Sequence, residues 1–426
     1  MISRRGFLQA GTIAAGSTIA AAPLMAAGKS SLPSSIAALK SMKSEARPFI
    51  REEYLQRQEN ARRLMQSNRL DAILLMEGTS LSYFTGIHWW GAERLFVTVL
   101  PAKGEAFYVC PAFEEGRARE QIKAHFGDQG ADVRVWQEHD SPYQLVAQGF
   151  KDRGIATGSV GVEETVRFVF ADGIAKASSQ TQLSSATAVT AGCRMRKSAH
   201  EIELMRLAAK VTLKAYEAAY RGLKAGMTQA QFQDLISAAH TRLGFPGEAS
   251  VQVGEYSAYP HGSVTPQVIR EGTIILIDGG CKVEEYSSDI SRTFVLGKPS
   301  DKMKKVFDIV HEAQSTALKT ARPGLECQSV DAAARKVVSD GGYGPDYKFF
   351  THRVGHGMGM DVHEWPYLVR GNNLPLEADM TFSDEPGIYI RGEFGVRLED
   401  DMHITESGAE LFTPQSPSLE DPFATA

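Results

Sequence analysis

Four carboxylates and one histidine in the last third of the chain limit its fold more than any other feature: Asp278, Asp289, His356, Glu385 and Glu399. Asp278 closes the apolar run 274–277, which predicts a buried strand, and Gly279-Gly280 lets neighbouring backbone approach the carboxylate closely. Asp289 begins a second strand in SSDISRTF. His356 lies in HRVGHGMG, where three glycines predict a shaped loop or a strand edge in place of a helix.

Mutual repulsion restricts these carboxylates if the fold brings them together. Without a cation some of them would have to stay protonated, whereas two divalent ions neutralise all four. An oxygen-rich set with one imidazole favours Mn²⁺, with Co²⁺ or Zn²⁺ as substitutes. Two ions roughly 3.5 to 4 Å apart would hold a bridging hydroxide and polarise a scissile carbonyl. Each residue alone is more often a turn, cap or packing residue, so the prediction of a dinuclear hydrolytic centre depends on the whole set.

Motifs spread over about 194–405 resemble the pita-bread metallopeptidases (peptidase family M24), which include Xaa-Pro aminopeptidase, prolidase, methionine aminopeptidase and creatinase. These motifs are RMRKSAHEIELMRLAA, YPHG, IDGG, SSDISRTF, HRVGHGMGMDVHEWP, DEPGIY and VRLED. They cover the whole second half of the chain. The resemblance therefore implies a pita-bread domain with pseudo-two-fold symmetry, and it narrows the expectation to the Xaa-Pro aminopeptidase and Xaa-Pro dipeptidase branch.

The same resemblance implies a role for each member of the ligand set. By position, Asp278 would bind one metal ion, while Asp289 and Glu399 would bridge both. His356 and Glu385 would complete the shell of the second ion. All five positions match the family's pattern.

Four further residues match positions that this family places beside its metals. His261 and His363 resemble two histidines that hold substrate and steady the tetrahedral intermediate. His352 matches a third substrate-binding histidine, with a supporting or packing role as the alternative. Arg397 resembles an arginine that orients carboxylates and supports proton movement, and Glu385 is expected to shuttle the proton to the leaving nitrogen.

The family branch implies an exopeptidase that removes the first residue from peptides with proline second, an Xaa-Pro aminopeptidase. Proline makes the scissile bond a tertiary amide without an N–H. Peptidases that bind this N–H handle the bond badly, so a dedicated enzyme is useful. The alternative is an Xaa-Pro dipeptidase, or prolidase, and a carboxylate-binding group that caps the cleft would separate the two. A catalytically inactive pita-bread protein that binds peptides is an alternative of another class.

The chain divides into four predicted parts: an export signal at 1–27, a linker or arm at 28–45, a first domain at 46–188 and the metallopeptidase domain at 189–426. In the first domain, a helix over 52–68 precedes apolar runs that predict strands, which favours an α/β (α+β) mixed sheet. The fragment TSLSYFTG resembles the amino-terminal domain of creatinase and prolidase relatives.

A faint duplication crosses the second half of the chain. A helix over 198–221, with Ser198 and Glu201 as a capping box, leads through a turn into a helix that begins TQAQF. A second helix pair begins at Lys302 and continues in SVDAAARKVVSDGG. Strands with predicted ligands follow each pair, so the two units should meet across a central cleft that holds the metals.

Trp89, in the Trp89-Trp90 pair after TGIH, is a candidate substrate-binding residue, because relatives close the site with aromatic side chains from this region, often on a neighbouring subunit. The alternative is a packing anchor. A homo-oligomer, either dimer or tetramer, is expected on the same ground. The four cysteines are too scattered for a disulfide framework or a metal site, and they are expected to be buried and unpaired.

The amino terminus has the pattern of a twin-arginine export signal, with Arg4-Arg5 before an Ala/Gly/Thr-rich stretch that ends near Ala27. It predicts a periplasmic enzyme without stable membrane insertion after export. A net charge of −5 and the lack of a basic run argue against a nucleic-acid partner. Peptides with proline in the second position are the expected partners.

Overall fold

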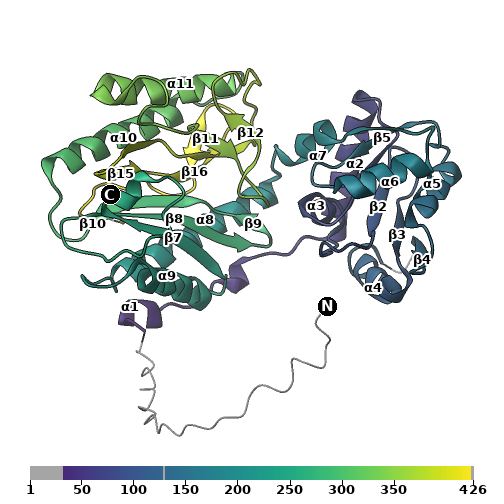
Figure 1. Ribbon diagram of the computed structural model, residues 1–426, viewed down its shortest axis with the longest axis horizontal. Helices are drawn as coiled ribbons and strands as arrows, with labels where there is room; N and C mark the ends of the chain where they lie inside the picture. The colour runs from purple at the N-terminus through teal and green to yellow at the C-terminus, as the bar shows by residue number, and fades with distance from the viewer. Residues whose placement is uncertain (1–31, 128–129, 424–426) are drawn as a thin grey trace, which may run out of the picture.

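The computed structural model describes residues 32–127 and 130–423, which form two domains (Figure 1). The predicted export signal lies outside the described residues. Within the predicted arm, helix α1 (Ser34–Ala37) packs against the second domain. There Ile36 is fully buried, and the Ser35 hydroxyl donates to the Ala218 carbonyl at 2.8 Å. This segment thus reaches the second domain before the chain enters the first.

A six-stranded mixed sheet forms the centre of the first domain, in the order β4-β3-β2-β1-β5-β6. Its strands are β1 (Ala72–Leu75), β2 (Val97–Pro101), β3 (Phe107–Pro111), β4 (Asp132–Trp136), β5 (Ser159–Val162) and β6 (Gln182–Ser185). Strand β2 pairs antiparallel with β3, whereas β1 pairs parallel with β5, so the sheet is mixed as predicted. Strands β1 to β3 are buried throughout, as expected for strands covered on both faces.

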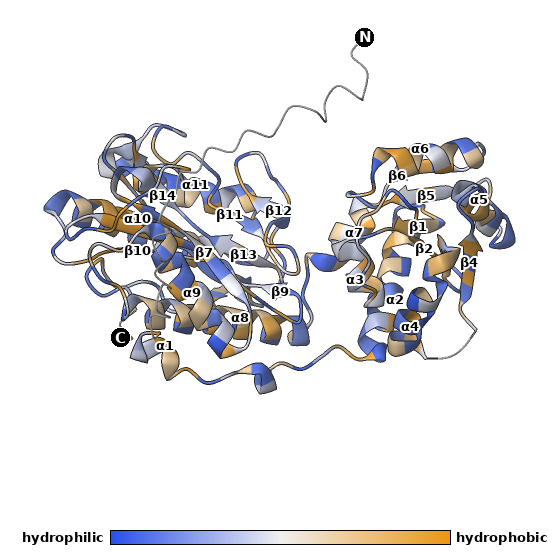
Figure 2. Cartoon of the chain, turned by 60° about the horizontal axis from the view of Figure 1, so that its bottom comes forward, coloured by the Kyte–Doolittle hydropathy of each residue, from blue (hydrophilic) through white to orange (hydrophobic). Residues whose placement is uncertain are grey.

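Helices pack on this sheet and enclose its apolar side chains (Figure 2). They are α2 (Arg51–Ser67), α3 (Thr79–Thr85), α4 (Glu115–Phe126), α5 (Pro142–Asp152), α6 (Phe168–Ala177) and α7 (Thr187–Arg194). The predicted 52–68 helix corresponds to α2. It begins after Ile50, whose backbone N–H donates to the Glu53 carboxylate at 2.9 Å and so satisfies one of the free donors of the first turn.

The first unit of the second domain is a helix pair followed by antiparallel strands. Its elements are α8 (Ala199–Tyr220), α9 (Gln229–Leu243), β7 (Gly247–Val253), β8 (Ile274–Val283), β9 (Tyr286–Ser287) and β10 (Ile290–Val295). The predicted capping box is present: the Ser198 N–H donates to the Glu201 carboxylate at 2.7 Å, and the Ser198 hydroxyl accepts from the Glu201 N–H. The strands pair in the order β10-β8-β7, with β9 on β8.

The second unit repeats this plan with α10 (Asp301–Thr320) and α11 (Cys327–Val338) before its strands. The strands are β11 (Gly355–Gly357), β12 (Glu364–Leu368), β13 (Thr381–Asp384), β14 (Gly387–Ile390), β15 (Phe394–Arg397), β16 (Asp400–Ile404) and β17 (Ala409–Leu411). Five of them form a sheet in the order β12-β11-β13-β16-β17, while β14 pairs with β15. Helices α8 and α9 lie on one side of the strand layer and α10 and α11 on the other (Figure 1). The predicted duplication and pita-bread architecture are confirmed.

Buried polar contacts join the two domains. The Arg57 guanidinium of α2 donates to the Tyr286 hydroxyl at 2.9 Å and lies 3.3 Å from the Glu201 carboxylate. The Ser82 hydroxyl donates to the Glu285 carboxylate at 2.7 Å. Among the described residues, no helix combines the length and hydropathy that crossing a bilayer requires.

Candidate metal centre

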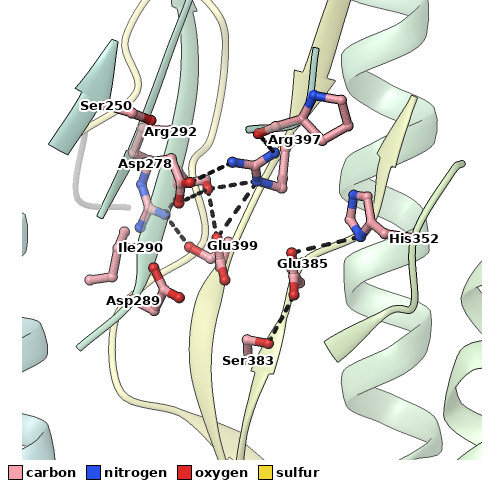
Figure 3. A network of polar contacts seen from close by, with 12 residues as sticks. Ser250, Asp278, Asp289, Ile290, Arg292, His352, Ser383, Glu385, Arg397 and Glu399 are labelled. Carbon is pink, nitrogen blue, oxygen red and sulfur yellow. Dashed lines mark hydrogen bonds and ion pairs between the residues drawn. The ribbon is translucent and has the colours of Figure 1, made fainter. Parts of the chain in front are cut away.

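All five predicted ligands meet in one cluster, to which both units of the second domain contribute. Figure 3 shows its four carboxylates, Asp278, Asp289, Glu385 and Glu399. Asp278 lies within β8, Asp289 just before β10, His356 in β11, Glu385 just after β13, and Glu399 between β15 and β16. Three sets of three residues could each hold an ion, because in each set one ligand atom per residue lies within 4.8 Å of the other two. The sets are Asp278, Asp289 and Glu399; His356, Glu385 and Glu399; and Asp289, His356 and His363. The overlap of the three sets gives the cluster room for more than one cation.

Glycines let the strands that carry the ligands approach one another closely. A Cβ on Gly280 would overlap the Ser288 carbonyl, and one on Gly355 would overlap the Ser383 carbonyl. Two details of the prediction are wrong. Strand β8 continues past Asp278 to Val283, and His356 lies in a short interior strand between β12 and β13 instead of a loop or sheet edge. The glycine run in this segment serves close strand packing, a use that sequence spacing alone does not separate from a loop.

The His356 ring is oriented for coordination. Its Nδ1 lies 3.1 Å from the Gly357 carbonyl, which favours a proton on that nitrogen. The other nitrogen, Nε2, lies 3.3 Å from Glu385 Oε1 and 3.7 Å from Asp289 Oδ2. Burial lowers the pKa of His356 to about 3, with the neighbouring His363 adding to the effect. The ring is therefore neutral at pH 7 and has a free lone pair facing two carboxylates.

Arg397 and Ser291 hold two of the carboxylates from the side (Figure 3). The Ser291 hydroxyl lies 2.8 Å from Asp278 Oδ1 and 2.6 Å from Glu399 Oε2. The Arg397 guanidinium lies 2.7 Å from Asp278 Oδ2 and donates to Ser291 Oγ at 3.0 Å. Arg397 thus contacts Asp278 directly and the hydroxyl of Ser291, and the carboxylate-orienting role that the resemblance implies stays a prediction. Ser291 was missed, although it lies in the SSDISRTF motif two residues after Asp289 and pairs in register with Asp278.

Burial of so much negative charge is the strongest sign that the site takes cations. Burial raises the pKa of Asp289 and of Glu399 well above the usual carboxyl range, and neighbouring carboxylates raise it further. Burial also raises the pKa of Glu385 to about 7, against the opposing charge of Arg397. Without a cation the cluster would have to keep protons at neutral pH. Two divalent ions fit this donor set because they replace the protons with charge that the carboxylates can coordinate.

The cluster opens into a cavity of about 510 Å³, within the usual size of a small-ligand site. Besides the ligands and Arg397, its walls are Pro260, His261, Tyr347, His352, Arg353, His363 and Val369. His363 is exposed, and its ring packs against the His356 ring in a tilted arrangement with 3.9 Å between centroids. The cavity therefore places His261 and His363 beside the cluster.

The remaining predicted site residues are placed differently. The Nε2 of His352 lies 2.6 Å from the Tyr389 hydroxyl and its Nδ1 lies 2.8 Å from the Arg353 carbonyl, which favours a supporting role over direct substrate contact. Trp89 is 9% exposed, stacks on Phe96 at 3.9 Å and does not line the cavity in the described part of this chain. The packing alternative accounts for its position within one subunit.

A buried carboxylate cluster with one imidazole, open to a cavity on a duplicated pita-bread fold, defines a metal-dependent hydrolase. Residues 203–406 match the model of metallopeptidase family M24, and residues 57–196 match the creatinase/prolidase N-terminal domain. The chain belongs to this family, whose members depend on two metal ions. The family expectation from the motifs is confirmed.

Full-length relatives support the same assignment. An Xaa-Pro dipeptidase from Lactobacillus delbrueckii subsp. lactis is 32% identical over 84% of this chain and 96% of its own length. The solved structure of dipeptidase PepE from Mycobacterium ulcerans, at 33% identity, has a TM-score of 0.82 and covers 88% of this chain and 99% of that one. An X-Pro aminopeptidase structure from Thermotoga maritima, at 29% identity, has a TM-score of 0.73 with 85% and 99% coverage. The chain is a hydrolytic metallopeptidase of the exopeptidase type.

Proposed function

We propose that this protein is an Xaa-Pro dipeptidase that uses two divalent cations. The similarity to an Xaa-Pro dipeptidase over 96% of that relative's length carries the proposal, because it spans both domains. The carboxylate cluster described above supports it. The dipeptidase alternative thus replaces the aminopeptidase expectation. Mn²⁺ is the proposed ion, with Co²⁺ or Zn²⁺ as substitutes, because four of the five ligands are carboxylates.

The five clustered residues would hold the cations: Asp278, Asp289, His356, Glu385 and Glu399. When bound, the two ions supply an acidified water and polarise the scissile carbonyl. The protein supplies their placement, since Ser291 and Arg397 fix two of the carboxylates and the Gly357 carbonyl fixes the imidazole. The substrate amino group and scissile carbonyl would lie in the cavity beside them.

Glu385 would move a proton to the proline nitrogen as that nitrogen leaves. Its carboxylate is held by the Ser383 hydroxyl at 3.3 Å and lies 3.7 Å from the His352 ring, so it has one orientation toward the cavity. His363 would hold the developing oxyanion, and His261 would contact the proline side. Arg397 would keep Asp278 oriented throughout.

Metal analysis followed by a comparison of substrates tests this function. The purified, Mn²⁺-supplemented protein should hold two ions per chain and release the first residue from Xaa-Pro dipeptides. It should hydrolyse Xaa-Pro-Yaa tripeptides at least about tenfold less efficiently. A tripeptide has no carboxylate on its proline and therefore loses one charge-assisted contact, which corresponds to at least about a tenfold loss. Equal rates on both substrates would indicate an aminopeptidase. Peptide binding without hydrolysis would indicate the inactive binding protein.

The proton role of Glu385 has its own test. In Glu385→Gln, kcat should fall by about 10²- to 10⁴-fold, the usual contribution of a positioned acid–base group. Metal content must be measured in the same sample, because the residue is also a proposed ligand. Glu406→Gln, an exposed site in the same domain, serves as the control. Full turnover by a Glu385→Gln protein that retains both ions would exclude the shuttle role.

Export and assembly remain separate proposals. The twin-arginine signal at Arg4-Arg5 lies outside the described residues, and cell fractionation of the full chain would test the periplasmic location. A homo-oligomer, tested by sedimentation, is proposed on the expectation that a neighbouring subunit closes the site. A monomer with full activity would remove that role for the Trp89 loop.

A further inference from the structure

The cavity contains two arginines that differ sharply in their partners. Arg397 is committed to the cluster, because its guanidinium contacts Asp278, Ser291, the Pro260 carbonyl and the Tyr389 hydroxyl. Arg353 also lines the cavity, yet within residues 32–127 and 130–423 no carboxylate pairs with its guanidinium. The guanidinium instead lies over the Tyr367 ring, with 4.0 Å between its carbon and the ring centroid. Burial raises the pKa of Glu385 and the charge of Arg353 opposes that rise from a distance, but among the described residues this half-buried cation has no carboxylate in contact with it.

The backbone on both sides of Arg353 is fixed from behind. The Arg335 guanidinium donates to the His352 carbonyl at 2.7 Å, and the Asp331 carboxylate accepts from the Val354 N–H at 2.9 Å. Arg335 and Asp331 form a buried ion pair with each other at 2.9 Å. The His352 ring also contacts the Arg353 carbonyl, which makes four polar contacts around this segment. They fix the backbone of Arg353, whose guanidinium pairs with no carboxylate in the described chain.

Tyr367 places that head group on the same face of the sheet as the metal cluster. It lies in β12 directly opposite His356 of β11 in the antiparallel register. Directly opposed residues in such a pair project to the same face. An arginine stacked on Tyr367 is therefore carried on the same side as the proposed metal ligand, and the ring limits its freedom to turn away.

We propose that Arg353 binds the free C-terminal carboxylate of the dipeptide substrate. In an Xaa-Pro dipeptide this carboxylate is one residue beyond the scissile carbonyl, within about 4 Å of it. Its receptor must therefore line the same cavity as the metal cluster. Arg353 meets this condition, and a guanidinium offers two parallel donors to a carboxylate. Arg94, by contrast, is in the first domain, is paired with Glu138 and does not line the cavity.

This assignment rests on the proposed dipeptidase function and explains how the chain could prefer dipeptides. A dipeptide places its carboxylate against Arg353, whereas a tripeptide presents a neutral amide at that point and leaves the cation unpaired. The preference then depends on one charge-assisted contact instead of a steric wall. Loss of the charge should reduce selectivity for short substrates without reducing the chemistry.

The test compares one dipeptide in two forms, the free acid and its C-terminal amide, with the metal-loaded enzyme. The wild type should prefer the acid by about 10- to 100-fold in kcat/KM, the range for a hydrogen bond to a charged group. In Arg353→Gln this ratio should approach one, mainly through a higher KM for the acid. The metal content and far-UV circular dichroism of Arg353→Gln should match those of the wild type, which shows that the variant is folded and loaded. Arg353→Lys should recover part of the preference.

A matched control is Arg391→Gln, since Arg391 also stacks on a tyrosine ring at 4.0 Å but does not line the cavity. Its acid-to-amide ratio should equal that of the wild type. An unchanged ratio in Arg353→Gln would overturn the assignment while leaving the dipeptidase function intact. A wild-type enzyme that hydrolyses neither form would instead overturn the proposed function, and the assignment with it.

Discussion

The two domains treat buried charge in opposite ways. In the described part of the first domain, Arg57 and Glu163 are the buried charged residues, and strands β1 to β3 are buried and almost entirely apolar. The second domain buries many more: Lys197, Glu201, Asp289, Arg292, Asp331, Arg335, Glu364, Asp384, Arg397, Glu399, Asp400 and Asp401. Because an isolated buried charge costs several kcal/mol, the first domain can rely on hydrophobic burial, whereas the second depends on ion pairs and cations.

Metal removal should break this comparison most strongly. Chelation of the loaded protein should abolish peptidase activity, by at least about 10³-fold, because no other group in the cluster can polarise the carbonyl. It should also destabilise the second domain by about 4 kcal/mol at a free metal concentration of 1,000 times Kd. Calorimetry with and without chelator would measure this loss, and the transition of the first domain should not move.

Asp289→Asn should reproduce the effect of chelation, because it removes a carboxylate that is proposed to bridge both ions. Thr98→Val is a matched control in the first domain, where the Thr98 hydroxyl is buried and has no hydrogen-bond partner among the described residues. Removal of that hydroxyl should leave activity unchanged and stability unchanged or slightly higher. A shift of both domains on metal removal would show that they unfold as one unit.

Loss of a buried ion pair should have the next largest effect. Arg292 is fully buried, 2.7 Å from the Asp400 carboxylate, and it also donates to the Glu399 carbonyl at 2.9 Å. Arg292→Met should destabilise the protein by about 3 to 5 kcal/mol, because it leaves the buried Asp400 carboxylate without its counter-ion, with only the neutral donors Gln314 and Thr413 still in contact. Denaturant unfolding would measure the change. The double variant Arg292→Met/Asp400→Asn should recover part of the loss, and a double variant no more stable than the single one would contradict this cause.

Local signals predicted most of the elements that carry the site. The Ser198 and Glu201 capping box and the apolar run before Asp278 each depend on neighbouring residues. Such patterns act over a few positions, so the sequence displays them directly. The motif resemblance added the order in which distant ligands would meet.

What the sequence did not reveal depends on contacts between segments. Ser291 acts on Glu399, 108 positions away, and Arg353 is notable because no carboxylate pairs with it in the described chain. Neither fact has a local pattern. The same holds for His356, whose glycine neighbours indicate a loop until the strands on both sides are known. Tyr389 of the DEPGIY motif is a further example, because only the fold shows that its hydroxyl contacts both Arg397 and His352.

Two glycines provide the smallest and sharpest test of the comparison. In β11, a Cβ on Gly355 would overlap the Ser383 carbonyl, which is backbone and cannot turn away. In β5 of the first domain, a Cβ on Gly161 would meet the end of the Leu70 side chain at 2.9 Å and the Cβ of Ala186 at 3.0 Å. Gly355→Ala should cost about 1 to 3 kcal/mol by overpacking and should displace His356 from its partners. Gly161→Ala should cost less, because the Leu70 side chain can change rotamer, and it should leave metal content unchanged. Unfolding curves and metal analysis of both variants would measure these differences. Equal metal loss in both would show that the cluster responds to strain anywhere in the protein, and not specifically to displacement of the strand that carries His356.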